Sequence, residues 1–347
     1  MLNILEPRAA PVAGARPASV PLALVTLPWA AVGALLLGWW TAPHLLERFI
    51  FVPLLLSVVL FGLPHGALDH LVPGRLGWAW GRRPRWVVLY CVLYAALAGL
   101  YLLAWRFAPL PALWVFLLVS ALHWGQGDLH FLEVGLGRRR PARWSAPLAL
   151  LARGSLPILV PLLAFTGDFE RLARGAALAF GGQVEVAALL PPDLRTLFTL
   201  GLAGLLALYA LDTLRAASPG RRALELAEAA LLLLLFLTVP APLSIGVYFT
   251  LWHAWRHLGR LLALGTGQAR HPSRRGAPRL AADLLPITLA ALGMLGGLYL
   301  WAAPRVASVE TFTALYLALI AALTLPHALV VALMDVPPRT RETAHAG

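Results

Sequence analysis

FIFVPLLLSVVLFGLPHGALDH, residues 49–70, joins an almost wholly apolar run to a segment with two histidines, an aspartate and a proline. The apolar run could lie in lipid, where a polar or ionisable side chain is costly and usually marks a functional site. Three other apolar stretches of the chain also carry histidines near one end. Fold and candidate site therefore have to be worked out together.

The composition indicates an integral membrane protein. The 347 residues are 60% hydrophobic and only 13% charged, whereas soluble domains are about one quarter charged. We therefore expect an all-α fold, a polytopic transmembrane helix bundle. The single cysteine, Cys91, excludes a disulfide within the chain and a thiolate metal cluster.

The apolar segments predict about ten membrane spans, with a range of eight to ten. A span needs about 20 mostly apolar residues. Segments of suitable length are 20–41, 47–66, 86–107, 110–131, 144–165, 194–214, 222–240, 243–262, 283–303 and 308–334. The range arises mainly because Pro240 and Pro242 divide the seventh and eighth segments. Segment 166–193 predicts a loop with a short amphipathic helix.

The two ends of the chain differ from the apolar centre. Residues 1–19 are rich in Ala, Pro and Arg, which predicts a disordered N-terminal tail. A transmembrane domain, 20–335, and a C-terminal tail, 336–347, follow. The first apolar run, 20–41, is long enough to span a bilayer, which argues against a cleaved signal peptide.

The basic residues predict an orientation in the cell membrane. All 28 are arginine, and with a cytoplasmic N-terminus 21 of them fall on the cytoplasmic side and six on the opposite side. Such asymmetry predicts a multi-pass protein with both termini cytoplasmic. It also explains the net charge of +12 by loops beside anionic lipid, without nucleic acid as a partner. Arg256 and Arg260 are expected to snorkel to the headgroups, whereas Arg153, within a span, requires a buried partner.

Seven of the ten histidines lie on only four predicted spans. They are His65 and His70 on the second, His123 and His130 on the fourth, His253 and His257 on the eighth, and His327 on the tenth. These even-numbered spans run in one direction and carry their histidines near the cytoplasmic end. A lone buried histidine is usually a hydrogen-bonded core residue. Clustering at one depth instead favours a metal site between helices.

The local spacing also favours a metal. HAWRH, 253–257, places two imidazoles at i and i+4 on one helix face. A zinc protease would have Glu at the second position, and Ala254 there disfavours peptide hydrolysis. Asp69 and Asp128 follow histidines by four and five residues. Each carboxylate can orient a ligating imidazole, or can instead cap a helix or pair with an arginine.

Two proline–histidine sequences and the donor types narrow the chemistry. LPH occurs at 63–65 and 325–327, and a proline kink before each histidine would turn the ring toward the bundle axis. An ordinary kink of a membrane helix is the alternative. Imidazoles without thiolates suit Zn, Cu, Fe or Ni. An apolar bundle implies a lipid-soluble substrate, so redox or oxygen chemistry at iron is favoured over hydrolysis at zinc.

The motifs together resemble the Brp/Blh family of bacterial and archaeal membrane β-carotene 15,15′-dioxygenases. Four blocks carry the resemblance in order: GLPHGALD (62–69), LHWGQGD (122–128), WHAWRH (252–257) and LTLPHALV (323–330). The resemblance implies an O2-dependent oxidoreductase that cleaves the central double bond of β-carotene into two molecules of retinal. It also implies a lipid bilayer around the protein and a functional link to a retinal-binding rhodopsin.

The resemblance further implies a site. Its motifs correspond to four ligands of a non-haem Fe2+ ion: His65, His123, His253 and His257. His327 corresponds to a histidine that supports the ligands or faces the substrate, and Asp69, Asp128 and Trp124 of the same blocks are expected in one of the same two roles. No organic cofactor and no catalytic residue beyond the metal centre are implied, and His70 and His130 have no counterpart. Trp124, Trp252 and Trp255 either stack on the polyene or serve in packing and interfacial anchoring.

The residues bear on three rival functions. A di-iron membrane desaturase or hydroxylase also uses HxxxH, but the HxxHH boxes of those enzymes are absent from this sequence. A retinal-carrying opsin needs a lysine for its Schiff base, and the chain has no lysine. A transporter fits ten spans and kinked helices, and it would move its substrate without cleavage and without iron.

Overall fold

The structure, a computed structural model, describes residues 22–57, 59, 62–181, 189–263, 277–306 and 308–335. Both expected tails, 1–19 and 336–347, lie outside these residues, as do the side chains of His65, residues 262–263, 277–281 and Glu310. In the described ranges every regular element is helical. The expected all-α helix bundle is therefore confirmed.

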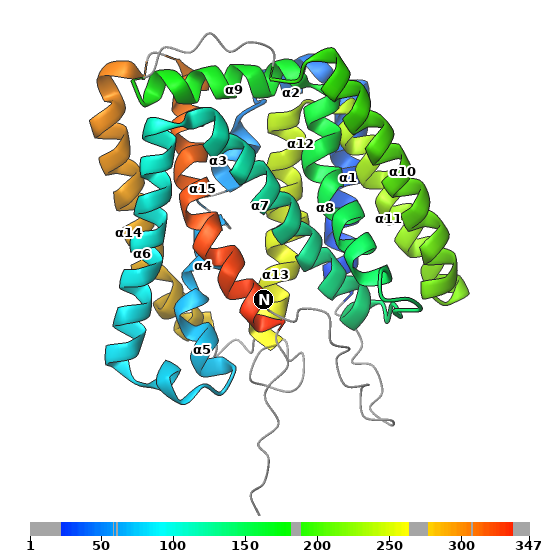
Figure 1. The fold of residues 1–347 in the computed structure, drawn as a ribbon, viewed down its shortest axis with the longest axis horizontal. Coiled ribbons are helices and arrows are strands. Elements are labelled where there is room, and N and C mark those ends of the chain that lie inside the picture. The colour runs from blue at the N-terminus through cyan, green and yellow to red at the C-terminus, as the bar shows by residue number, and fades with distance from the viewer. Residues whose placement is uncertain are drawn as a thin grey trace, which may run out of the picture.

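Long helices run side by side through the molecule, and short ones connect or interrupt them (Figure 1). The helices are α1 (Ala23–Thr41), α2 (Pro43–Glu47), α3 (Val52–Ser57), α4 (Leu63–Ala67), α5 (Val72–Arg75), α6 (Pro84–Phe107), α7 (Pro109–His130), α8 (Ser145–Ala164), α9 (Thr166–Ala179), α10 (Pro192–Ala216), α11 (Pro219–Thr238), α12 (Ala241–Tyr248), α13 (Trp255–Ala263), α14 (Ala277–Ala302) and α15 (Val309–Met334). Two π-helical segments, η4 (Phe131–Gly135) and η5 (Phe249–Ala254), and three 3-10 turns, η2 (Asp69–Leu71), η3 (Ala79–Arg82) and η6 (Ala303–Arg305), complete the described elements.

Seven described helices are long and apolar enough to cross a membrane, so the expected count of about ten is not confirmed. The seven are α1, α6, α7, α8, α10, α14 and α15, with η4 and η6 continuing two of them. The other three expected spans are interrupted or charged. Segment 47–66 is divided among α2, α3 and α4, and segment 243–262 is divided by η5. Helix α11, within 219–238, carries Glu225 and Glu228 inside the bundle.

The amphipathic helix expected within 166–193 is α9, and its orientation is unlike that of the long helices. It lies across one end of the bundle (Figure 1) and packs on α15. Its apolar face, with Phe169, Ala173 and Ala176, is buried in the main hydrophobic core. Helix α9 therefore closes this end of the bundle.

Helices α7 and α8 approach each other backbone to backbone. A Cβ atom added at Gly154 would lie 1.9 Å from the carbonyl oxygen of Ala121, and one added at Gly125 would lie 2.1 Å from that of Leu150. Small residues at a helix interface allow such close packing in membranes. Because any larger side chain would separate the helices, the two glycines fix how α7 and α8 face each other.

A buried ionic network lies beside this glycine contact. Arg153 of α8 is fully buried, and its Nε donates to Asp128 Oδ2 at 2.8 Å while its Nη2 donates to Glu228 Oε2 at 3.0 Å. Arg256 donates to Glu228, and Trp252 Nε1 donates to Asp128 Oδ1 at 3.2 Å. Two guanidinium groups thus face two carboxylates across α7, α8, α11 and α13. The sequence required one buried partner for Arg153, and the structure provides two, Asp128 and Glu228.

Arginines expected at the headgroups are inside the protein, so the snorkelling expected of Arg256 and Arg260 is wrong. Both side chains are buried, and Arg260 Nη2 pairs with Asp335 Oδ1 at 2.7 Å. Arg138, from the segment after η4, is also buried and pairs with Asp212 and Glu225. Acidic partners on α10, α11 and the end of α15 explain the difference, because a charge with a partner does not need to reach water.

The α7–α8 contact gives a first prediction. Gly154→Ala should lower the free energy of unfolding by about 1–3 kcal/mol, because the added methyl group overpacks the interface. Gly201→Ala in α10 is the matched control, since a Cβ atom there meets nothing within 4 Å. Unfolding in detergent micelles, followed by circular dichroism, measures the difference. Equal stability of the two variants would contradict the close helix contact.

The ionic network gives a second prediction. Arg153→Met should cost about 3–5 kcal/mol of stability, because it leaves buried carboxylates short of a partner. Arg171→Met should cost less than that, since the side chain of Arg171 is 60% exposed in its pair with Asp168. The same unfolding measurement compares them. A loss no larger for Arg153 than for Arg171 would refute the proposed importance of the network.

Candidate metal centre and substrate cavity

Four histidines from three parts of the sequence lie together inside the bundle. His123 lies on α7, His253 on η5, His257 on α13 and His327 on α15, and all four are buried. The ring centroid of His123 lies 4.8 Å from that of His253 and 4.7 Å from that of His327, and those of His257 and His327 lie 5.2 Å apart. The structure thus unites residues that sequence spacing had placed only at a similar depth.

Two of these imidazoles already point their nitrogens at each other. His253 Nε2 lies 3.1 Å from His123 Nε2. Two nitrogens bound to one metal at right angles, with bonds of about 2.1 Å, would lie about 3.0 Å apart. The His253 and His257 rings are inclined by only 8°, at 6.1 Å between centroids. They therefore share one helix face, as the HxxxH spacing predicted, although a π-helical turn precedes the second histidine. Such turns are frequent at functional sites.

His327 is held by a carboxylate. Its Nδ1 lies 2.8 Å from Asp69 Oδ2, and the Tyr94 hydroxyl lies 3.2 Å from the same oxygen. A carboxylate on the far nitrogen of an imidazole is the usual outer partner of a metal-binding histidine. The sequence left two interpretations of Asp69: it orients an imidazole, or it caps a helix or pairs with an arginine. The structure shows Asp69 bonded to an imidazole, which belongs to His327 near the far end of the chain.

The position of His65 is known only through its backbone. His65 lies in α4, and its side chain is outside the described residues. A Cβ atom added at the next residue, Gly66, would lie 3.9 Å from His327 Nδ1, so α4 passes beside the histidine cluster. Within the described residues, no three His, Cys, Asp or Glu side chains are arranged to hold a metal ion together.

The two proline–histidine sequences have different local structures. Pro64 lies in the first turn of α4, and the described residues just before it, Val59 and Gly62, are π-helical. Pro326 lies inside α15, which is one helix from Val309 to Met334. The expected kink at Pro64 stays a prediction, because residues 58, 60 and 61 lie outside the described residues.

Asp128 and the tryptophans divide between the site and its surroundings. Asp128 pairs with Arg153 and accepts from Trp252, which matches its interpretation as an arginine partner. Trp255 donates to the Ala23 carbonyl at 3.1 Å. Trp124 lies beside the cluster, 5.8 Å from His253 between ring centroids. Of the three tryptophans, Trp124 alone lines the cavity described next.

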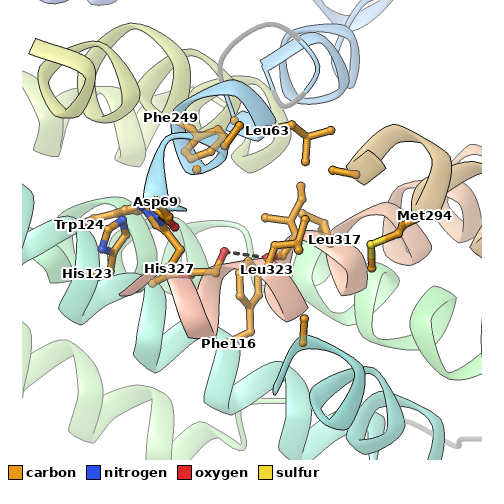
Figure 2. Close-up of a pocket in the computed structure, with 18 of the residues that line it drawn as sticks. Leu63, Asp69, Phe116, His123, Trp124, Phe249, Met294, Leu317, Leu323 and His327 are labelled. Atoms are coloured by element: carbon orange, nitrogen blue, oxygen red, sulfur yellow. Dashed lines mark hydrogen bonds and ion pairs between the residues drawn. The ribbon is translucent and has the colours of Figure 1, made fainter. Parts of the chain in front are cut away.

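An apolar cavity of about 280 Å³ begins at the histidines. Figure 2 shows His123, Trp124, Asp69 and His327 at one end of the cavity and Met294 at the opposite end, with apolar side chains between them. His70 also lines it, with Nδ1 2.7 Å from the Ala67 carbonyl oxygen. His130 does not line this cavity.

The cavity runs along helices α7 and α15. The residues that line it from α15 are Leu317, Ile320, Leu323, Thr324 and His327, and those from α7 include Leu113, Leu117, Ser120 and His123. This spacing presents one face of each helix. From Leu317 to His327 the cavity extends roughly 15 Å at the rise of an α-helix. It ends at Phe169 and Leu172 of α9. An elongated apolar chain can therefore lie along the cavity and extend from the histidines toward α9.

Sequence reasoning did not identify Tyr94 or Glu228. Tyr94 contacts Asp69, and Glu228 neutralises two arginines. Each had a visible signal. Tyr94 stands in YCVLY (90–94) within an otherwise apolar span, and Glu228 is an acid within the apolar segment 222–240. Polar groups at such depth require partners.

Comparison with known proteins assigns the family. The sequence model of the family described as Beta-carotene 15,15'-dioxygenase matches residues 56–335. A Halobacterium salinarum protein named Probable beta-carotene 15,15'-dioxygenase Blh is 39% identical over 328 residues, which cover 90% of this chain and 92% of that protein. Beta-carotene 15,15'-dioxygenase of uncultured marine bacterium 66A03 is 25% identical over 82% of this chain and 94% of its own.

A second Halobacterium salinarum protein, Probable beta-carotene 15,15'-dioxygenase Brp, is 30% identical over 60% of this chain and 58% of its own length. No solved structure matches this chain. The family match covers the four histidine blocks and every residue that lines the cavity except Leu54. The chain therefore belongs to the β-carotene 15,15′-dioxygenase family of carotenoid-cleaving oxidoreductases.

Proposed function

We propose that this protein cleaves the central 15,15′ double bond of all-trans-β-carotene with O2, giving two molecules of all-trans-retinal, at a non-haem Fe(II) held by histidines. One observation carries the proposal: a buried cluster of histidines stands at one end of an apolar cavity inside a membrane protein. The substrate named for the relatives is a hydrocarbon polyene, which matches the apolar wall.

The donor types suit iron. His65, His123, His253 and His257 would hold the ion, and neutral imidazoles without thiolates are donors that iron accepts. The separation of 3.1 Å between His123 Nε2 and His253 Nε2 supports a shared metal ion, and α4 brings the backbone of His65 beside the same cluster. His327, whose Nδ1 is held by Asp69, lies next to these rings, where it orients the ligating histidines or adds a further nitrogen to them. Iron, when bound, supplies the redox chemistry that lets O2 react with the double bond.

The protein itself positions the polyene and keeps water out. The walls of the cavity hold one half of the extended molecule, so its central bond lies at the histidines. Trp124 offers an aromatic face at that point. The reaction balances without a further reductant, because one C=C and the O=O bond break and two C=O bonds form. Each aldehyde takes one oxygen atom.

The location follows from the substrate. β-Carotene dissolves in the bilayer, so a multi-pass protein of the cell membrane, with both termini cytoplasmic, meets it directly. Seven apolar helices of spanning length support the membrane location. Retinal is also lipid-soluble, and a retinal-binding rhodopsin in the same membrane is the partner that would consume it.

The ligand assignment predicts a linked loss of metal and activity. His253→Ala and His257→Ala should each lower the iron content of purified protein by at least about tenfold and abolish retinal formation. His44→Ala is the control, because His44 is exposed and pairs only with Glu47 at 3.5 Å. Metal analysis and chromatography of retinal give the two measurements. Full iron and full activity in either cluster variant would refute that ligand.

The whole reaction is tested by expression in cells that make β-carotene. The cells should lose their orange colour and accumulate retinal, and under 18O2 each retinal should contain one labelled oxygen. Cells that express His253→Ala serve as the control and should stay orange. Persistent carotene beside folded, iron-loaded protein would contradict the proposed function.

A further inference from the structure

The cavity has one side that the other helices do not cover. On α14 the lining residues Ile287 and Met294 are 39% and 40% exposed, and on α6 the lining residue Ala95 is also exposed. By contrast, the lining residues His123 and Leu117 of α7 are buried. The cavity therefore reaches the outer surface of the bundle along α6 and α14.

Each of these two helices packs mainly on other helices. Helix α6 packs on α7 and α15, and α14 packs on α4 and α15. The residues that α6 and α14 present to the cavity at mid-height are small: Ala95 and Ala98 on α6, Ala290 and Ala291 on α14. Small side chains on both edges leave a gap where a helix pair would normally close.

Side-chain contacts limit the gap between α6 and α14 at both of its ends. At the α9 end, Phe180 bridges the two helices, with its ring centroid 6.4 Å from that of Trp105 and 5.8 Å from that of Trp301. At the other end, Tyr90 of α6 and Leu284 of α14 both pack on the hydrophobic cluster that contains Leu68 and Val72.

The separation of these limits follows from the helix rise. The distance along α6 from Tyr90 to Trp105 is roughly 22 Å, and that along α14 from Leu284 to Trp301 is roughly 25 Å. The gap is thus a tall, narrow window, parallel to the helices. Figure 2 places Met294, at its edge, across the cavity from His123 and His327.

We propose that this α6–α14 window is the port through which the polyene enters sideways from the bilayer. The inference rests on the proposed function for the identity of the substrate. One half of a stiff, thin hydrocarbon can pass edge-on through a tall slot of this height, and its long axis then already lies along the cavity. No polar group has to lose water on the way, because the edges of the window are apolar apart from Tyr90, Cys91 and Tyr94.

A reversible block of the window tests the proposal. Cys91 is the only cysteine, so Cys91→Ala provides a cysteine-free background for Ala95→Cys and Ala290→Cys at the window. Ala96→Cys and Leu289→Cys are matched controls, since both positions are exposed on the same helices and neither lines the cavity. Each protein, in nanodiscs, is treated with benzyl methanethiosulfonate, and dithiothreitol later removes the benzyl group.

The first readout is the rate at which β-carotene associates under anaerobic conditions, followed by quenching of tryptophan fluorescence. The benzyl group at position 95 or 290 should slow association by about tenfold or more, and at 96 or 289 by less than about twofold. Dithiothreitol should restore the rate, which shows that the fold was intact. Equal rates for all four modified proteins would overturn the window.

The second readout separates the window from the chemistry. After air is admitted, unmodified protein should convert the bound carotene into retinal. Normal, window-dependent association without any retinal would refute the proposed cleavage and leave the port intact. Retinal formation that is unaffected by the benzyl groups would refute the port and leave the cleavage intact.

Discussion

The buried charge of Arg153 is the constraint on which the rest of this bundle depends. An ion moved into a medium of low dielectric costs of the order of 20 kcal/mol in the Born limit, and Arg153 is completely inaccessible to solvent. Asp128 and Glu228 must therefore stay beside it, and Arg256 balances the second carboxylate. Since these residues come from four helices, neutrality at one point fixes α7, α8, α11 and α13 against one another.

The same network orients the histidines. WHAWRH contains two interlocked i,i+4 pairs, offset by one residue. Trp252 and Arg256 point to the ionic network and contact Asp128 and Glu228, respectively. Successive residues of a helix are rotated by about 100° around its axis. His253 and His257 therefore point away from the ionic network and toward the histidine cluster. The arginine inside the motif therefore holds the histidine pair in place, and its charge lies on the side away from the cavity.

The sequence predicted those features that depend on local spacing. The histidine pair on one face, the amphipathic α9 and the three histidine segments that converge from α7, η5–α13 and α15 all follow from periodicity and depth. The remaining features depend on contacts between distant segments. Asp69 was paired in expectation with a histidine four residues away, yet His327, 258 residues away, is its described partner. The span count is not confirmed for a related reason. Glu225 and Glu228 interrupt an apolar pattern, and their arginine partners come from other segments of the chain.

The two sides of the bundle are packed differently, and this difference suits the proposed chemistry. Around the histidines, α7 and α8 touch through glycines, and a charge network adds further links. Rigid support of this kind keeps ligands in place. On the opposite side, α6 and α14 bury few of their side chains, and Phe180 and the cluster with Leu68 and Val72 link them near their ends. Local opening is easiest where few apolar contacts are buried. A long substrate can thus enter through α6 and α14 while the residues that would hold the metal keep their positions.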